Sequence, residues 1–205
     1  EAVGSLADNR HPFIGVLLGE LAKGTLGDGR VLKQLREQAG QVMRGLSLQV
    51  LTVTGADDRV LITPHYRDAT DDTNATIRER AAKTNGEPYF AFEQVRTGPT
   101  VETVLVAESS HLSRKDGFTV ALSAGRKVPD KLLAGIRRQG RVDARGVDAK
   151  DQVLIKPTSD WAKIAKDPPI TMPLVGPDGK TVARIEVVVS DGDLDTVLRN
   201  ITLIS

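Results

Sequence analysis

One stretch of sequence decides the fold: Leu48-Gln-Val-Leu-Thr-Val-Thr-Gly-Ala-Asp-Asp-Arg-Val-Leu-Ile-Thr-Pro-His65. Its two apolar, β-branched segments, residues 48–53 and 59–63, are typical of strands. The glycine and the two aspartates between them are typical of a tight turn. The stretch therefore predicts a β-hairpin. Pro64 ends the second strand, because proline has no N–H to donate to a strand ladder.

The residues that follow predict one helix and three more strands. A polar, acidic stretch beginning at Asp68 suits the start of a helix, and Asn85-Gly86 suits its end. Strands are predicted at residues 89–96, 101–108 and 118–123. Most of the connections are too short for a parallel crossover, so we expect an antiparallel sheet over residues 48–127.

The N-terminal residues predict helix. Apolar residues recur near a 3.6-residue period before and after the break at residues 25–29. We expect a long N-terminal helical element, a spine, over residues 1–47.

The second half of the chain predicts a smaller mixed module over residues 128–205. Helices are expected at residues 129–139, at 159–165 and from Asp191 to the end, and strands at 170–174 and 181–189. Residues 149–157 repeat residues 56–64 with six identities in nine positions. Either the chain holds two related modules, or any hairpin with an acidic turn looks like this. The predicted fold class is α+β.

The composition excludes several classes of protein. The 205 residues contain no cysteine, which rules out disulfide scaffolds, iron–sulfur clusters and thiol catalysis. A net charge of +1 and 3% aromatic residues argue against nucleic-acid binding. No apolar run is long enough to span a bilayer. The chain begins without methionine and ends in an apolar run at residues 201–205, so we interpret it as a fragment of a longer protein.

The search for catalytic or metal-binding motifs predicts neither an enzyme nor a cofactor. His11, His65 and His111 lack the spacing of a helical zinc site, and no nucleophile elbow is present. Asp71-Asp72 is more typical of a helix start than of a metal site.

A cluster of aromatic and polar residues around the strand at 89–96 is the candidate ligand site. An apolar wall with a few polar groups is typical of a small-molecule pocket, although the same residues could be core and solvated surface. Alternation places Phe90, Phe92, Gln94 and Arg96 on one face of this strand and Tyr89, Ala91 and Glu93 on the other. The candidate ligand-binding residues are His65, Tyr66, Arg67, Tyr89, Phe90, Phe92, Gln94, Arg96 and Glu102.

The order of elements resembles the Cache family of PAS-like extracytoplasmic sensor domains, especially those of bacterial membrane-bound histidine kinases. The resemblance is carried by the hairpin at 48–65, by Phe118-Thr-Val-Ala-Leu-Ser-Ala-Gly-Arg126, and by Met172-Pro-Leu-Val-Gly-Pro-Asp-Gly-Lys-Thr-Val-Ala-Arg-Ile-Glu-Val187. It implies a double PAS-like architecture, with a membrane-distal sensor module at 48–127 and a smaller membrane-proximal module at 128–205. The amino-acid-binding signature of the best-defined double-Cache subfamily is not found.

The resemblance also implies a function. A small molecule, an organic acid or an amino acid, would bind the distal module and shift the domain between two conformations. Flanking transmembrane segments would carry that shift to a cytoplasmic kinase, in a receptor that is a homodimer in the inner membrane with this domain in the periplasm. The alternatives are a periplasmic protein-interaction module without a small-molecule ligand, or the sensor of a chemoreceptor or diguanylate cyclase.

Overall fold

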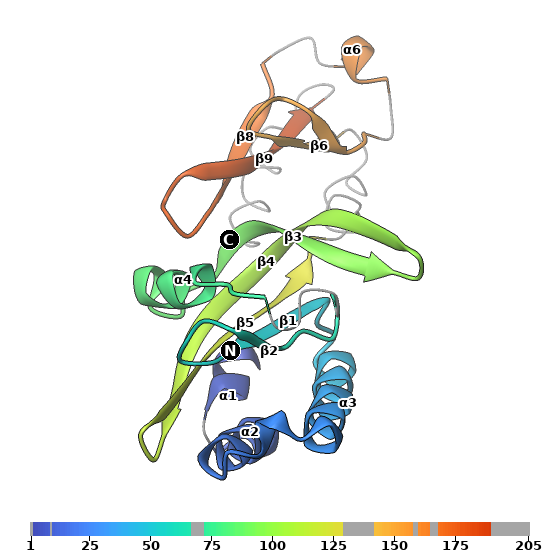
Figure 1. The fold of residues 1–205 in the computed structure, drawn as a ribbon. Coiled ribbons are helices and arrows are strands. Elements are labelled where there is room, and N and C mark those ends of the chain that lie inside the picture. Colours follow the sequence, from blue (N-terminus) through green and yellow to red (C-terminus); the bar gives the residue numbers. More distant parts are fainter. Residues whose placement is uncertain are drawn as a thin grey trace. The chain divides into compact units, whose positions relative to one another are not determined.

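The computed structural model describes residues 2–8, 10–66, 72–128, 142–157, 160–164 and 168–189. The chain divides into two compact units, Glu1–Lys127 and Val128–Ser205. Each unit contains one antiparallel sheet (Figure 1). The predicted α+β class is confirmed.

The first sheet has the strand order β2-β1-β5-β4-β3. Its strands are β1 (Val50–Thr54), β2 (Val60–Ile62), β3 (Tyr89–Thr97), β4 (Thr100–Lys115) and β5 (Phe118–Lys127). β1 and β2 form the predicted hairpin, with Asp58 at a positive φ of 63° in its turn. β4 is longer than the sequence predicts. Its serine-rich half, residues 109–115, has little strand propensity but continues because it pairs with β5 along its whole length.

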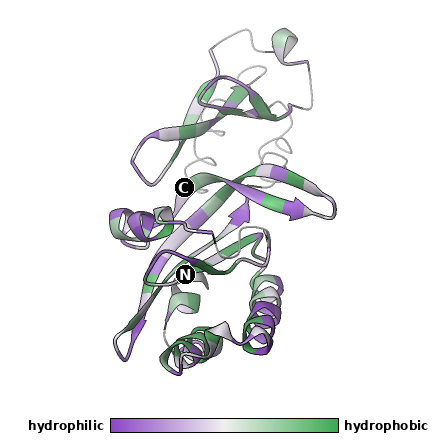
Figure 2. Cartoon of the chain, viewed as in Figure 1, coloured by the Kyte–Doolittle hydropathy of each residue, from purple (hydrophilic) through white to green (hydrophobic). Residues whose placement is uncertain are grey.

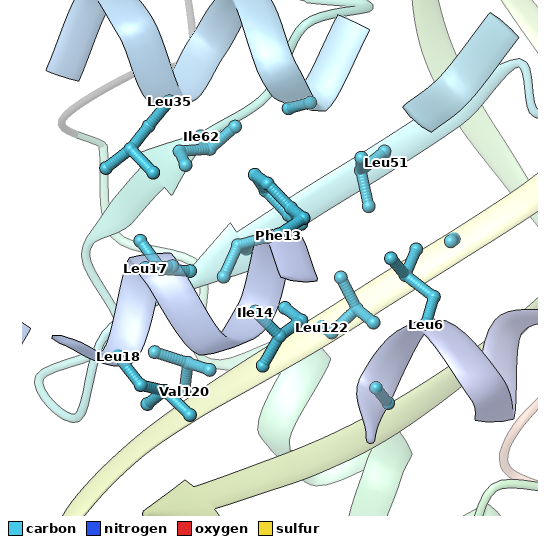
Figure 3. Close-up of a cluster of buried hydrophobic side chains, with 14 of the residues drawn as sticks. Leu6, Phe13, Ile14, Leu17, Leu18, Leu35, Leu51, Ile62, Val120 and Leu122 are labelled. Carbon is cyan, nitrogen blue, oxygen red and sulfur yellow. The ribbon is translucent and has the colours of Figure 1, made fainter. Parts of the chain in front are cut away.

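The N-terminal helices cover one face of this sheet. They are α1 (Ala2–Ala7), α2 (Pro12–Ala22) and α3 (Gly29–Gly45), with the 3₁₀ turn η1 (Thr25–Gly27) between α2 and α3. The region is helical as predicted, and η1 lies in the predicted break at residues 25–29. In addition, α1 is separate from α2, and the helices pack on the sheet (Figure 1). They bury Phe13, Ile14, Leu17 and Leu35 against Leu122 and its neighbours, the core of unit 1 (Figure 3).

Local chemistry explains where these helices begin. Pro12 occupies the first turn of α2, where its missing N–H costs no hydrogen bond. The Asp28 side chain accepts a hydrogen bond from the N–H of Arg30 and caps α3. α2 is largely hydrophobic, whereas α3 carries many hydrophilic residues (Figure 2). Only a narrow stripe of α3, Leu35 and Ala39, is therefore fully buried.

α4 (Thr76–Thr84) packs on the same unit, and its side chains meet the sheet through β3 and β4. Asn85 ends this helix in the left-handed conformation, as predicted, and its N–H donates to the carbonyl of Ala81. Its first predicted residues, 68–71, lie outside the described residues.

The second sheet has the strand order β7-β6-β9-β8. Its strands are β6 (Val142–Asp148), β7 (Val153–Ile155), β8 (Ile170–Val175) and β9 (Thr181–Val189), and α6 (Trp161–Ile164) is a single helical turn. The helices predicted at 129–139 and from Asp191 onward lie outside the described residues. Asp151 has a φ of 64° in the β6–β7 turn, which matches Asp58 in the β1–β2 turn.

Candidate functional site

A buried polar cluster occupies the α4 face of the first sheet. Register fixes its members: Tyr89 pairs with Glu108, Glu108 pairs with Gly125, and Ser110 pairs with Ser123. Directly opposed residues of an antiparallel sheet point to the same face. The side chains of Tyr89, Glu108, Ser110 and Ser123 therefore lie together.

Hydroxyl groups connect this cluster to a buried carboxylate. The Tyr89 hydroxyl lies 2.6 Å from Ser110 Oγ, which lies 2.9 Å from Ser123 Oγ. Ser123 donates a hydrogen bond to Glu108 Oε1. Glu108 is only 4% exposed, and its other oxygen, Oε2, accepts no hydrogen bond.

Arg80 of α4 contacts both carboxylates of the cluster. Its Nη1 lies 2.7 Å from Glu93 Oε1 and 3.5 Å from Glu108 Oε2. Its guanidinium also lies 5.7 Å from the centre of the Tyr89 ring, within reach of a cation–π interaction. The side chains of Arg80 and Glu93 are about a quarter exposed, so solvent reaches the cluster at this end.

Burial controls the protonation of these groups. Desolvation, aided by the neighbouring Glu93 carboxylate, raises the pKa of Glu108 to about 7, although Ser123 and Arg80 oppose this shift. Burial also raises the pKa of Tyr89. The site therefore combines one guanidinium, two carboxylates and three hydroxyl groups in a partly dry environment.

His65 ties the segment after β2 to two strands. Its Nδ1 lies 3.1 Å from both the N and the O of Leu51 on β1, and its carbonyl accepts a hydrogen bond from the N–H of Arg96 on β3. Burial lowers the pKa of His65, while the Glu93 carboxylate raises it.

The structure separates the predicted site residues into two groups. Tyr89 lies in the polar cluster, and Glu102 shares its face of the sheet at an exposed position. His65 contacts Leu51 and Arg96. Tyr66 lies in the segment after β2 and is half-buried, and Arg67 lies outside the described residues.

The second group lies on the opposite face of β3, as the alternation predicts. Phe90 pairs with Ala107, which pairs with Arg126, so this face is the one that α1–α3 cover elsewhere. Phe92 is 37% exposed, and Gln94 and Arg96 are exposed as well. A ligand role for either group stays a prediction.

Sequence reasoning did not include Arg80, Glu93, Glu108, Ser110 or Ser123 in the site. One signal was present. Val104, Val106, Glu108 and Ser110 alternate along one strand, so a carboxylate stands at a position where the pattern demands an apolar residue. The partner Arg80 carries no comparable signal, because an arginine on a short polar helix is typical of solvated surface.

Within the described part of the chain, no group of His, Asp and Glu side chains is placed to hold a metal ion. In the same residues, no helix is long and apolar enough to cross a membrane.

No protein-family model and no curated protein matches the chain. Among solved structures, the chain is similar to the sensor domain of the histidine kinase DctB from Vibrio cholerae. That match has a TM-score of 0.51 and 8% identity, and it covers 87% of this chain and 85% of the other.

Two further structures are similar at lower scores. The periplasmic domain of LuxQ from Vibrio cholerae has a TM-score of 0.48 and 14% identity, over 90% of this chain and 88% of that one. The ligand-binding domain of the Campylobacter jejuni chemoreceptor Tlp3, solved with 4-methylisoleucine, has a TM-score of 0.42 and 13% identity, over 81% of this chain and 75% of that one.

The DctB match and the two antiparallel sheets with flanking helices agree with the resemblance drawn from the sequence. The chain therefore has the fold of this histidine kinase sensor domain.

Proposed function

We propose that the chain is the extracytoplasmic sensor domain of a membrane receptor and that it binds a small molecule at the polar cluster on the α4 face. The observation that carries the proposal is Glu108, a carboxylate buried in the sheet whose Oε2 lies 3.5 Å from Arg80 Nη1 but accepts no hydrogen bond. A buried acceptor without a donor costs free energy that a ligand donor would recover.

The chemistry of the cluster favours an amino acid or a related zwitterion. The carboxylates of Glu93 and Glu108 suit an ammonium group, and Arg80 suits a carboxylate through paired N–H donors. Arg80 already bonds Glu93, so a ligand carboxylate would compete with an internal partner. The domain itself performs no chemistry in this proposal, and its output is a cytoplasmic histidine kinase.

Binding would act through α4. Because Arg80 connects this helix to β3 and β4, a ligand that replaces its contacts favours a different position of the helix. In the proposed homodimeric receptor, the flanking segments pass this change across the membrane. The coupling cannot exceed the difference in ligand affinity between the two conformations.

A thermal-shift screen of amino acids and organic acids tests the proposal. At a ligand concentration of about 100 times Kd we expect Tm to rise by roughly 5 °C, since this concentration stabilises a single site by about 2.7 kcal/mol. Arg80→Ala and Glu93→Gln should remove most of the rise.

Arg96→Ala is the matched control, because it removes the same charge from the opposite face of β3. Circular dichroism of each variant checks that it folds. A rise lost in Arg96→Ala but retained in Arg80→Ala would move the site to the face of Phe90 and Phe92. If none of the screened compounds raises Tm, the result contradicts this proposal and favours the alternative, a protein-interaction module.

A further inference from the structure

A concave site lies on α3, and none of its lining residues belongs to the polar cluster. It is a groove of about 470 Å³ that runs along the C-terminal half of the helix. Leu48, which precedes β1, and Pro64, which follows β2, close it on the side of the sheet. Its size lies in the range of small-molecule pockets.

Two arginines line this groove, one on each side of a glycine in the sequence. Arg36, Gly40 and Arg44 are spaced at four-residue intervals and therefore follow one face of the helix. Side chains on a helix lean toward its N-terminus, so Arg44 folds back over Gly40. A Cβ placed on Gly40 would lie 3.6 Å from Arg44 Nη1 and would meet no other side chain within 4 Å.

Neither guanidinium has a protein partner in the described part of the chain. The Nε of Arg36 is buried without a hydrogen-bond acceptor. Glu37 also lines the groove, yet it forms no ion pair with either arginine among the residues that the structure describes. Two unpaired cations against one carboxylate leave the groove with a net positive charge.

The glycine supports a functional reason for this hollow. Gly40 lies inside a helix, where glycine is less favourable than alanine, and it has no positive φ that would require it. A larger residue here would fill the space beside the Arg44 guanidinium.

We propose that this groove binds a small organic anion that carries a carboxylate or phosphate group on an apolar body. Guanidinium groups pair with both oxyanions through parallel N–H donors, and neither arginine has a protein partner among the described residues that would compete for them. Leu48 and Pro64 provide an apolar wall that an inorganic ion would leave uncovered.

Isothermal titration of the chain at low salt tests the proposal with three probes: phenyl phosphate, benzoate and inorganic phosphate. We expect phenyl phosphate or benzoate to bind more tightly than inorganic phosphate, and the tighter of the two identifies the oxyanion. Arg36→Ala and Arg44→Ala should each weaken binding by about tenfold, the loss expected for one charge-assisted hydrogen bond.

Lys33→Ala is the control for charge, because Lys33 is an exposed cation on the same helix and does not line the groove. Gly40→Leu is a second variant that fills the groove and leaves both arginines in place, and it should abolish binding. The proposal is overturned if no probe binds. It is also overturned if Arg36→Ala and Arg44→Ala weaken binding no more than Lys33→Ala, or if Gly40→Leu binds as the parent chain does.

Discussion

Glu108 is the residue whose environment differs most from what its side chain prefers. A carboxylate that is 4% exposed has lost most of its hydration, and Arg80 at 3.5 Å restores only part of the lost stabilisation. Burial and the neighbouring Glu93 therefore raise the pKa of Glu108 to about 7. The polar cluster holds a proton at mildly acidic pH that an exposed glutamate would release.

This proton predicts the pH dependence of stability. Between pH 4.5 and 7 the folded chain keeps a proton on Glu108 that the unfolded chain has lost. The free energy of unfolding should fall as pH rises through this window, by up to about 3 kcal/mol, because the unfolded state binds fewer protons. Urea unfolding of the parent chain and of Glu108→Gln from pH 4 to pH 8 measures the difference.

The comparison with Glu108→Gln separates the contribution of Glu108 to the pH dependence of stability from that of His65. Burial lowers the pKa of His65, so its contribution to stability has the opposite sign and is lost as pH falls below about 6.5. Glu79→Gln, which removes an exposed carboxylate from α4, is the control for the loss of one charge. A constant difference between parent and Glu108→Gln over the whole range would contradict the buried, shifted carboxylate.

At the scale of elements, local chemistry predicted most of what the structure contains. The β1–β2 hairpin, the end of α4 at Asn85 and the faces of β3 each follow from turn residues or from alternation. The length of β4 does not follow from turn residues or alternation, because residues 109–115 form a strand through their pairing with β5 and not through their own strand propensity. Arg80 was missed for a similar reason, since only the packing of α4 on the sheet brings it to Glu108.

Two glycines show how differently one substitution acts in two elements. A Cβ on Gly125 of β5 would lie 2.6 Å from the carbonyl oxygen of Ala107 and 2.9 Å from the Cα of Glu108, so the backbone must shift. Gly125→Ala should lower the free energy of unfolding by about 1–3 kcal/mol. Gly19 of α2 has nothing within 4 Å of the same position, and Gly19→Ala should raise it by about 0.5–1 kcal/mol. Urea unfolding of Gly125→Ala and Gly19→Ala measures both changes. A stabilising Gly125→Ala would be incompatible with the close approach of Gly125 to the backbone of β4.

At the scale of the whole molecule, the two units share one topology. The order β7-β6-β9-β8 repeats β2-β1-β5-β4, with Asp151 at the turn position of Asp58, and the described residues of the second sheet contain no counterpart of β3. This supports two related modules over the chance resemblance of two hairpins.

The polar faces of the two modules differ. Thr52 pairs with Ser123 in the first sheet, and Arg145 pairs with Glu186 at the corresponding register in the second. Arg145 lies 2.7 Å from Glu186 and 4.4 Å from the centre of the Trp161 ring. An ion pair between two strand residues thus occupies, in the second module, the positions that Thr52 and Ser123 hold in the first, where the arginine of the polar cluster comes from the helix α4 instead.

We expect the first unit to fold and to bind its ligands without the second. The described residues of its core all precede residue 128, and both the polar cluster and the α3 groove lie within Glu1–Lys127. A fragment of residues 1–127 should fold, show a sheet-rich circular dichroism spectrum and unfold in one cooperative transition.

Its affinity for the tightest of the three groove probes, and for any ligand found in the screen, should lie within about threefold of the full chain, a difference of under 1 kcal/mol. An unfolded fragment would show that residues 128–205 complete the first core. A folded fragment that has lost both affinities would show that the sites depend on the second unit, because packing and register in the first sheet would then be present without the binding that they are proposed to create.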